Sequence, residues 1–230
     1  TRDRTATLSY GYNPYGNDLI DLTATLSYSD QQIDQESLVG PNPLLDADHR
    51  YETSKINVTN DAYFSTGAVS HFLKAGLELT HKKRLDASSA PGGTDKRVAV
   101  FAVDEISSGG LTVTPALRFE TQRVGGAAYS YYENEALMGG VSARYEWASG
   151  VSGFASAAYT ENLPIMDDLT NPTYMTQSEK ARTLEAGLGY DGAGLLSADD
   201  ALSAQATLFQ TRLWAVTSYS GVTRVEGRAL

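Results

Sequence analysis

Apolar and polar residues alternate along most of this chain, with the period of two that is typical of β-strands. From Leu111 to Phe119 the odd positions are apolar and most even positions are polar. The same alternation runs through segments 20–29, 73–80 and 182–190, where Arg182 is an exception. The pattern predicts amphipathic strands, each with one apolar and one polar face.

Turn-forming residues divide this pattern into about eleven strands. The predicted strands are 4–12, 17–30, 51–65, 68–82, 96–107, 110–121, 135–147, 151–161, 178–191, 199–215 and 221–230. Because about 9–11 residues suffice to cross a bilayer at a tilt, strands of this length can span a membrane and extend beyond it.

Short and long connections between the predicted strands alternate strictly. The short connections are 13–17, 66–67, 107–110, 148–150 and 192–199. The long connections are 31–50, 83–96, 121–134 and 161–178. A soluble β-sandwich has no physical reason to sort its loops in this way, whereas a membrane barrel has short turns at one rim and long loops at the other. We therefore predict an all-β, antiparallel, up-and-down transmembrane β-barrel.

The polar face of the predicted strands carries charged residues that would be costly against lipid. These residues are Lys74, Glu78, Arg118, Glu120, Arg144, Glu146 and Glu185. In a barrel they face a wet lumen. A soluble two-sheet sandwich would point the same side chains into bulk water, so a soluble binding module remains an alternative.

Aromatic residues gather near both ends of the predicted strands. Those near the short turns are Tyr10, Tyr12, Tyr15, Tyr63, Phe64, Phe72 and Tyr190, and those near the long loops are Tyr28, Tyr51, Tyr159, Phe209 and Trp214. Two aromatic belts are typical of two membrane–water interfaces. The alternative is that tyrosine is simply a favourable strand residue.

Composition narrows the possible functions. The chain has 230 residues, of which 41% are hydrophobic, and no apolar run is long enough for a transmembrane helix. The absence of cysteine excludes disulfides and thiolate metal sites. A net charge of −10 argues against nucleic acid as a partner, because nucleic-acid binding requires a basic surface.

Several segments together resemble the barrel of the TonB-dependent outer-membrane receptors. The resemblance covers the chain from about residue 68 onward, and it rests on the order and spacing of the segments. The segments are Val100–Ile106 with Leu111–Glu120, Phe154–Pro164, Ser178–Tyr190 and Val225–Leu230. Asn17–Leu22, Asn162–Pro164 and Asn171–Pro172 are also similar to segments of the haem and haemophore receptors, although no histidine lies between Pro164 and Asn171.

The resemblance implies that residues 1–230 are part of a barrel of roughly 22 strands with a plugged lumen. The chain starts directly in one predicted strand and stops in another. We therefore expect the plug domain, the remaining strands and the segment that engages TonB to lie outside it. The implied location is the bacterial outer membrane, in contact with lipid. The implied function is TonB-coupled import of a metal chelate, either haem or a ferric siderophore. The alternative is a passive pore or a structural barrel without energy coupling.

Candidate ligand contacts lie in the predicted long loops. They are His49, Tyr129, Tyr131, Tyr132, Tyr174 and Met175. Histidine and methionine can ligate haem iron, and aromatic rings stack on flat ligands. The alternatives are that His49 is a solvated loop residue and that the loop aromatics pack on one another over the barrel mouth.

No resident cofactor or metal site is predicted, and we expect no enzymatic activity. The carboxylate clusters lack the spacing of a calcium loop. Ser70 and His71 are adjacent in one strand and therefore point to opposite faces, which prevents them from acting as nucleophile and base. No Gly-x-Ser-x-Gly stretch occurs either.

Overall fold

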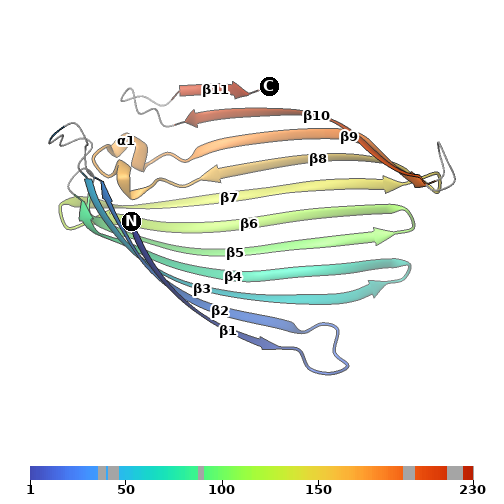
Figure 1. Cartoon of the computed structure of the whole chain (residues 1–230), viewed down its shortest axis with the longest axis horizontal. Coiled ribbons are helices and arrows are strands. Elements are labelled where there is room, and N and C mark those ends of the chain that lie inside the picture. Colours follow the sequence, from blue (N-terminus) through green and yellow to red (C-terminus); the bar gives the residue numbers. More distant parts are fainter. Residues whose placement is uncertain (36–39, 41–46, 88–90, 194–199, 217–224, 230) are drawn as a thin grey trace.

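Eleven antiparallel strands lie side by side in one curved sheet, in the order in which they follow along the chain (Figure 1). The computed structural model describes residues 1–35, 40, 47–87, 91–193, 200–216 and 225–229. The strands are β1 (Arg2–Tyr12), β2 (Asp21–Gln35), β3 (Ala47–Thr66), β4 (Val69–Ala87), β5 (Gly93–Ser108), β6 (Leu111–Gly126), β7 (Tyr129–Glu146), β8 (Val151–Asn162), β9 (Glu179–Ala193), β10 (Ala201–Val216) and β11 (Val225–Ala229).

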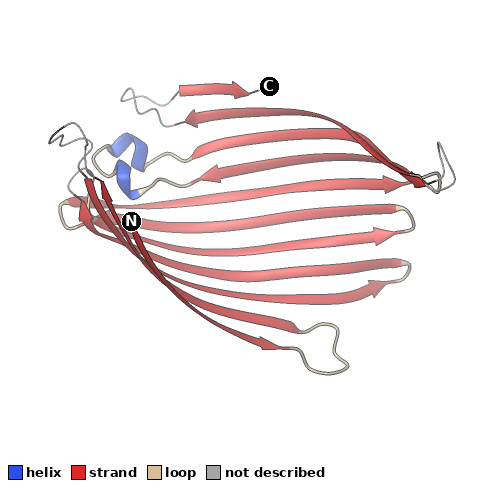
Figure 2. Cartoon of the chain, viewed as in Figure 1, coloured by secondary structure: helices blue, strands red, loops and turns tan. Residues whose placement is uncertain are grey.

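The up-and-down order confirms the predicted antiparallel meander. The described part of the chain forms a single layer, with β1 and β11 at the two ends of the sheet. A second sheet is not found there, so the sandwich alternative is wrong. The only helical turns among the described residues are η1 (Met166–Asp168) and α1 (Pro172–Met175), both between β8 and β9 (Figure 2). Neither is long and apolar enough to cross a membrane.

The strands define two rims of the sheet. The loop rim is the end at which β2, β4, β6 and β8 finish, and α1 lies there (Figure 1). The turn rim is the opposite end, where β1, β3, β5 and β7 finish. At the turn rim, Gly67 and Gly109 adopt φ values of 66° and 59°, which glycine tolerates without steric cost and which allow tight reversals.

Strand register assigns each side chain to one of two faces, and it confirms the predicted polar face. Glu78 lies opposite Ala99, and Ala99 lies opposite Glu120, so the two carboxylates share the face that we call the inner face. Thr112 lies on the same strand and face as Glu120, and its register partner on β7 is Arg144, so Arg144 also belongs to the inner face. All seven charged residues that were predicted to share a face do so.

The other face, called the outer face, is apolar and exposed. Its large aliphatic side chains have no second layer to cover them: Leu117 is 57% exposed, Leu188 is 62% exposed and Leu208 is 82% exposed. An apolar surface of this extent is a liability in water, and it is typical of the lipid-facing band of a transmembrane barrel.

The aromatic residues only partly follow the predicted belts. On the outer face, Tyr10 and Tyr190 lie toward the turn rim, and Trp214 lies toward the loop rim, where it contacts Tyr159 with ring centroids 6.0 Å apart. Tyr63 and Phe72 instead stack on the inner face with ring centroids 4.6 Å apart. Tyr51 and Phe209 also belong to the inner face by register. These four were therefore wrongly assigned to a membrane interface.

One predicted long loop is wrong. Segment 121–134 is not a loop, because β6 continues to Gly126, β7 begins at Tyr129 and only Ala127 and Ala128 connect them. Polar residues occur on both faces of these extensions, so the alternation of apolar and polar positions is lost there. The main-chain pairing of β6 with β7 nevertheless continues. The predicted loops 31–50 and 83–96 are likewise shortened by extensions of β2, β3, β4 and β5. The predicted turn at 192–199 lies largely outside the described residues.

Gly76 provides a test of the packing of the sheet. A Cβ at this position would lie 2.5 Å from the ring of Phe101 and 2.9 Å from the carbonyl oxygen of Val58, whereas a Cβ at Gly11 would meet nothing within 4 Å. Overpacking of this kind costs about 1–3 kcal/mol. Gly76→Ala should lower the free energy of unfolding by this amount in urea titrations in micelles, and Gly11→Ala should leave it nearly unchanged. Equal effects of the two substitutions would contradict the packing described.

Candidate functional site

Segment 163–178 folds inward at the loop rim, because its apolar residues are buried against the wall. Leu169 is 2% exposed and Met175 is fully buried. Together with Met166 and with Val124 of β6 they form an apolar cluster, against which Tyr129 and Tyr132 of β7 pack. We call segment 163–178 the inner loop.

Local sequence explains the helical turn within the inner loop. The side chain of Asn171 accepts a hydrogen bond from the main-chain N–H of Thr173 at 3.1 Å, as an N-cap residue does. Pro172 occupies the first helical position, where its missing N–H costs nothing. At the other end, the hydroxyl of Thr176 donates to the carbonyl oxygen of Pro172 at 3.2 Å. This turn places Tyr174 and Met175 in buried positions.

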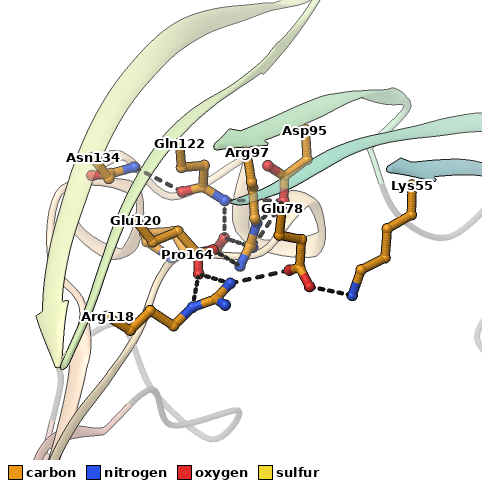
Figure 3. A network of polar contacts seen from close by, with 9 residues as sticks. All are labelled: Lys55, Glu78, Asp95, Arg97, Arg118, Glu120, Gln122, Asn134 and Pro164. Carbon is orange, nitrogen blue, oxygen red and sulfur yellow. Dashed lines mark hydrogen bonds and ion pairs between the residues drawn. The ribbon is translucent and has the colours of Figure 1, made fainter. Parts of the chain in front are cut away.

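The inner loop is tied to the wall through one main-chain carbonyl (Figure 3). The carbonyl oxygen of Pro164 accepts a hydrogen bond from Gln122 at 2.7 Å and another from Arg97 at 3.2 Å. Gln122 also donates to Asp95 at 3.0 Å, and its own oxygen accepts from Asn134 at 3.1 Å. Residues from β5, β6 and β7 therefore hold one point of the loop.

The same side chains belong to a larger charged network on the inner face. Arg97 pairs with Asp95 at 2.9 Å and with Glu120 at 3.3 Å. Arg118 pairs with Glu120 at 2.7 Å and with Glu78 at 3.0 Å. Lys55 extends the network from β3 by pairing with Glu78 at 2.5 Å (Figure 3).

Cations and carboxylates alternate through this network, and three of each are present. The side chains of Asp95 and Glu120 are 7% and 9% exposed, so removing one partner would leave a buried charge uncompensated. The network therefore pairs each of its buried carboxylates with a cation, and it balances its own charge.

A second tie joins the inner loop to β4. Arg84, whose side chain is 1% exposed, pairs with Asp167 at 2.5 Å. Its guanidinium also donates to Nδ1 of His49 and lies 5.1 Å from the centroid of the Tyr51 ring. The Nε atom of Arg84 and one carboxylate oxygen of Asp95 are buried without a hydrogen-bond partner.

Two cavities adjoin these ties. One of about 420 Å³ is lined by Tyr51, Glu78, Asp95 and Ile165 among others. Another of about 640 Å³ lies between Arg118, Met138 and Asn162. Their walls offer charged hydrogen-bonding groups, and the described residues contain no group of three His, Cys, Asp or Glu side chains that could hold a metal ion. Such an arrangement can bind a polar ligand.

The predicted ligand residues lie in three different settings. Tyr129, Tyr132 and Met175 come together at the apolar cluster, with Tyr174 (5% exposed) in the same helical turn. Tyr131 is 53% exposed, and its ring lies 5.1 Å from the guanidinium of Arg123. His49 contacts Arg84, and Arg84 lines a cavity of about 820 Å³ together with Tyr129 and Tyr131.

Sequence reasoning missed Asp95, Arg97 and Gln122. A signal was present, because opposite charges recur at inner-face positions of neighbouring strands at residues 95, 97, 118 and 120. The partner on the inner loop carried no signal, since any residue offers a main-chain carbonyl such as that of Pro164.

Among solved structures, the fold is similar to that of two receptors and one transporter. A double mutant of the Serratia marcescens haemophore receptor HasR, in complex with haemophore HasA and haem, has a TM-score of 0.77 and 18% identity, with 93% of this chain and 40% of that chain covered. The unliganded ferric citrate transporter FecA has a TM-score of 0.67 and 20% identity, with 93% and 34% covered. The ferric-catecholate import receptor Fiu of E. coli K12 has a TM-score of 0.71 and 15% identity, with 98% and 43% covered.

At these identities the likeness shows the fold alone, and the chain spans less than half the length of each structure. No curated protein sequence matches the chain. A family model described as TonB dependent receptor-like, beta-barrel, matches residues 1–225. Since this match covers nearly the whole chain and agrees with the eleven-stranded meander, the chain belongs to the TonB-dependent receptor β-barrel family.

Proposed function

We propose that the protein imports a metal chelate, either haem or a ferric siderophore, across the bacterial outer membrane with energy supplied through TonB. This chain would form part of the barrel wall and its mouth. The observation that carries the proposal is the inner loop, which is folded into the mouth and held by Arg97, Gln122 and Arg84. The apolar outer face supports embedding in lipid.

The inner loop is held by contacts that can be broken without unfolding the sheet. A hydrogen bond contributes about 0.5–1.5 kcal/mol net, or about 1.5–3 kcal/mol when one group is charged. Opening would break the hydrogen bonds that Arg97 and Gln122 donate to the carbonyl oxygen of Pro164, and it would separate the loop from Val124. The main-chain hydrogen bonds between the strands of the wall would stay intact. A ligand that contacts the loop more favourably in the open arrangement would shift this equilibrium.

The ligand contacts are proposed to occur in two stages. Tyr131 is exposed in the closed arrangement and is available to stack on a flat chelate. His49, Tyr129 and Tyr132 would contribute at the mouth. Tyr174 and Met175 are buried, so they would reach the ligand only after the inner loop has moved.

Energy coupling is tested by growth of cells in which the protein is the sole receptor and haem or a ferric siderophore is the sole iron source. Growth should stop when TonB is deleted, because an importer needs the coupled energy. A passive pore would support growth without TonB and would conduct ions in planar bilayers. That result would overturn the proposal.

Movement of the inner loop is tested with a single thiol, since the chain contains no cysteine. Met175→Cys places the thiol in the buried cluster, where labelling by a maleimide requires loop opening. Adding Gln122→Met removes a tie to Pro164 without changing charge, and a loss of about 1 kcal/mol should speed labelling about fivefold. Gln205→Met, on the inner face of β10, is the control. Equal labelling rates in both backgrounds would contradict the role of the tie.

The role of Tyr131 is tested by titrating haem and a ferric siderophore into the protein in micelles. Loss of a stacked ring costs about 0.5–1.5 kcal/mol, so Tyr131→Ala should weaken binding about fivefold. Tyr145→Ala is the matched control, because Tyr145 is also an exposed β7 tyrosine (43%) but lies near the turn rim. Unchanged affinity of Tyr131→Ala for both ligands would remove Tyr131 from the binding surface.

A further inference from the structure

Arg84 differs from the cations of the charged network in the element that supplies its carboxylate. The cations of the network, Lys55, Arg97 and Arg118, pair with carboxylates of the strands. Arg84 of β4 pairs with Asp167, which belongs to the inner loop. Movement of the inner loop would therefore leave the ion pairs of the network in place but would take away the carboxylate of Arg84.

The guanidinium of Arg84 is deeply buried and only partly satisfied. Its side chain is 1% exposed, and its Nε atom has no hydrogen-bond partner among the described residues. The contact with Asp167 runs from Nη1 to one carboxylate oxygen. A guanidinium and a carboxylate are able to form two parallel hydrogen bonds. Arg84 thus keeps donor capacity that a freely oriented carboxylate can use.

Opening of the inner loop without a replacement anion would be costly. Removal of one partner of a buried ion pair is strongly destabilising, because it leaves the other charge uncompensated. His49 accepts a hydrogen bond from Arg84, and the ring of Tyr51 lies 5.1 Å away, but neither group supplies a carboxylate. Lys82, whose Nζ atom lies 4.6 Å from the centroid of the same ring, adds a second positive charge. An anion that takes the place of Asp167 removes this cost.

A cavity of about 820 Å³ lies beside the ion pair of Arg84 and Asp167, and both residues line it. Lys83, Tyr129 and Tyr131 line it as well. Its volume falls within the range of roughly 300–1,000 Å³ that is typical of ligand sites. The side chain of Asp167 is 48% exposed, so a ligand in the cavity can reach the carboxylate that it would replace. Cations and tyrosine rings around one space suit a chelate that has a flat body and carboxylate arms.

We propose that Asp167 occupies the place of a ligand carboxylate on Arg84, and that a chelate with a free carboxylate displaces it and so releases the inner loop. The proposal rests on the function proposed above, and it narrows the ligands to chelates that carry a carboxylate, such as haem through its propionates or ferric citrate. Ligand binding then exchanges one ion pair for another, so the loop opens without leaving the charge of Arg84 unpaired.

The carboxylate is tested by titrating haem and haem dimethyl ester into the protein in micelles, since the ester keeps the iron and the ring but lacks the carboxylates. Partition into micelles affects each variant equally, so the ratio of the two dissociation constants is compared between variants. Arg84→Gln should lower the preference for haem over the ester roughly tenfold, because a charged hydrogen bond is lost. Arg144→Gln, which removes an inner-face arginine near the turn rim, is the matched control and should leave the ratio unchanged.

Ferric citrate and a neutral ferric trihydroxamate separate the two sources of a carboxylate. A weakening by Arg84→Gln that is confined to haem assigns the site to propionates, and one confined to ferric citrate assigns it to a carboxylate siderophore. The trihydroxamate should bind equally to both proteins. If Arg84→Gln weakens neither haem nor ferric citrate, or if neither of them binds, the proposal is wrong.

Displacement of Asp167 is tested by Asp167→Asn, which removes the competing charge. Binding of the chelate that depends on Arg84 should tighten roughly fivefold, and this gain should vanish in the Arg84→Gln background. Glu105→Gln, which removes an exposed inner-face carboxylate near the turn rim, is the control. Unchanged or weaker binding by Asp167→Asn would contradict displacement. Heat-modifiable mobility checks the folding of each variant, and if Arg84→Gln does not fold, the result for Asp167→Asn decides.

Failure of this proposal is distinguishable from failure of the proposed function. Growth that persists without TonB would overturn coupled import and leave the binding ratios as they are. An unchanged ratio in Arg84→Gln, in cells whose growth still requires TonB, would overturn the carboxylate site alone.

Discussion

The structure depends on one constraint, which is that the main-chain hydrogen bonds of each strand are made to the next strand in a single layer. Among the described residues no second sheet covers this layer, and only the inner loop covers part of the inner face. The apolar outer face, where Leu208 is 82% exposed, is left for an apolar solvent. The inner face is available to water and to a ligand at the mouth of the barrel. The period of two along each strand therefore determines which side chains face the apolar solvent and which face water.

The largest buried cluster of the described residues is not between strands but between the inner loop and β6. Val124, Met166, Leu169 and Met175 form it, and the ties from Arg97 and Gln122 to Pro164 lie beside it. This small core is separate from the ladder of the wall, so under the proposed function the inner loop would open while the sheet remains intact.

The likeness to HasR, FecA and Fiu at 15–20% identity has the same physical origin. A barrel wall requires alternation, strand length and short turns at one rim, and many sequences meet these requirements. The charged groups at the mouth and on the outer face are not constrained in this way. The charged network that joins Lys55, Glu78, Arg118, Glu120 and Arg97 is not among the requirements of a barrel wall.

The sequence by itself determined the meander, the approximate strand bounds and the faces of residues such as Glu78 and Arg118, because alternation and turn residues act locally. The hairpin predicted at 51–65 and 68–82 was found at Ala47–Thr66 and Val69–Ala87. The tertiary structure alone decided that 121–134 continues the sheet, that Met175 is buried and that Arg97 reaches Pro164. These features depend on contacts between residues that are far apart in sequence. Such contacts follow from the curvature of the sheet and from where the loop can bury its apolar side chains, and a local sequence pattern contains neither.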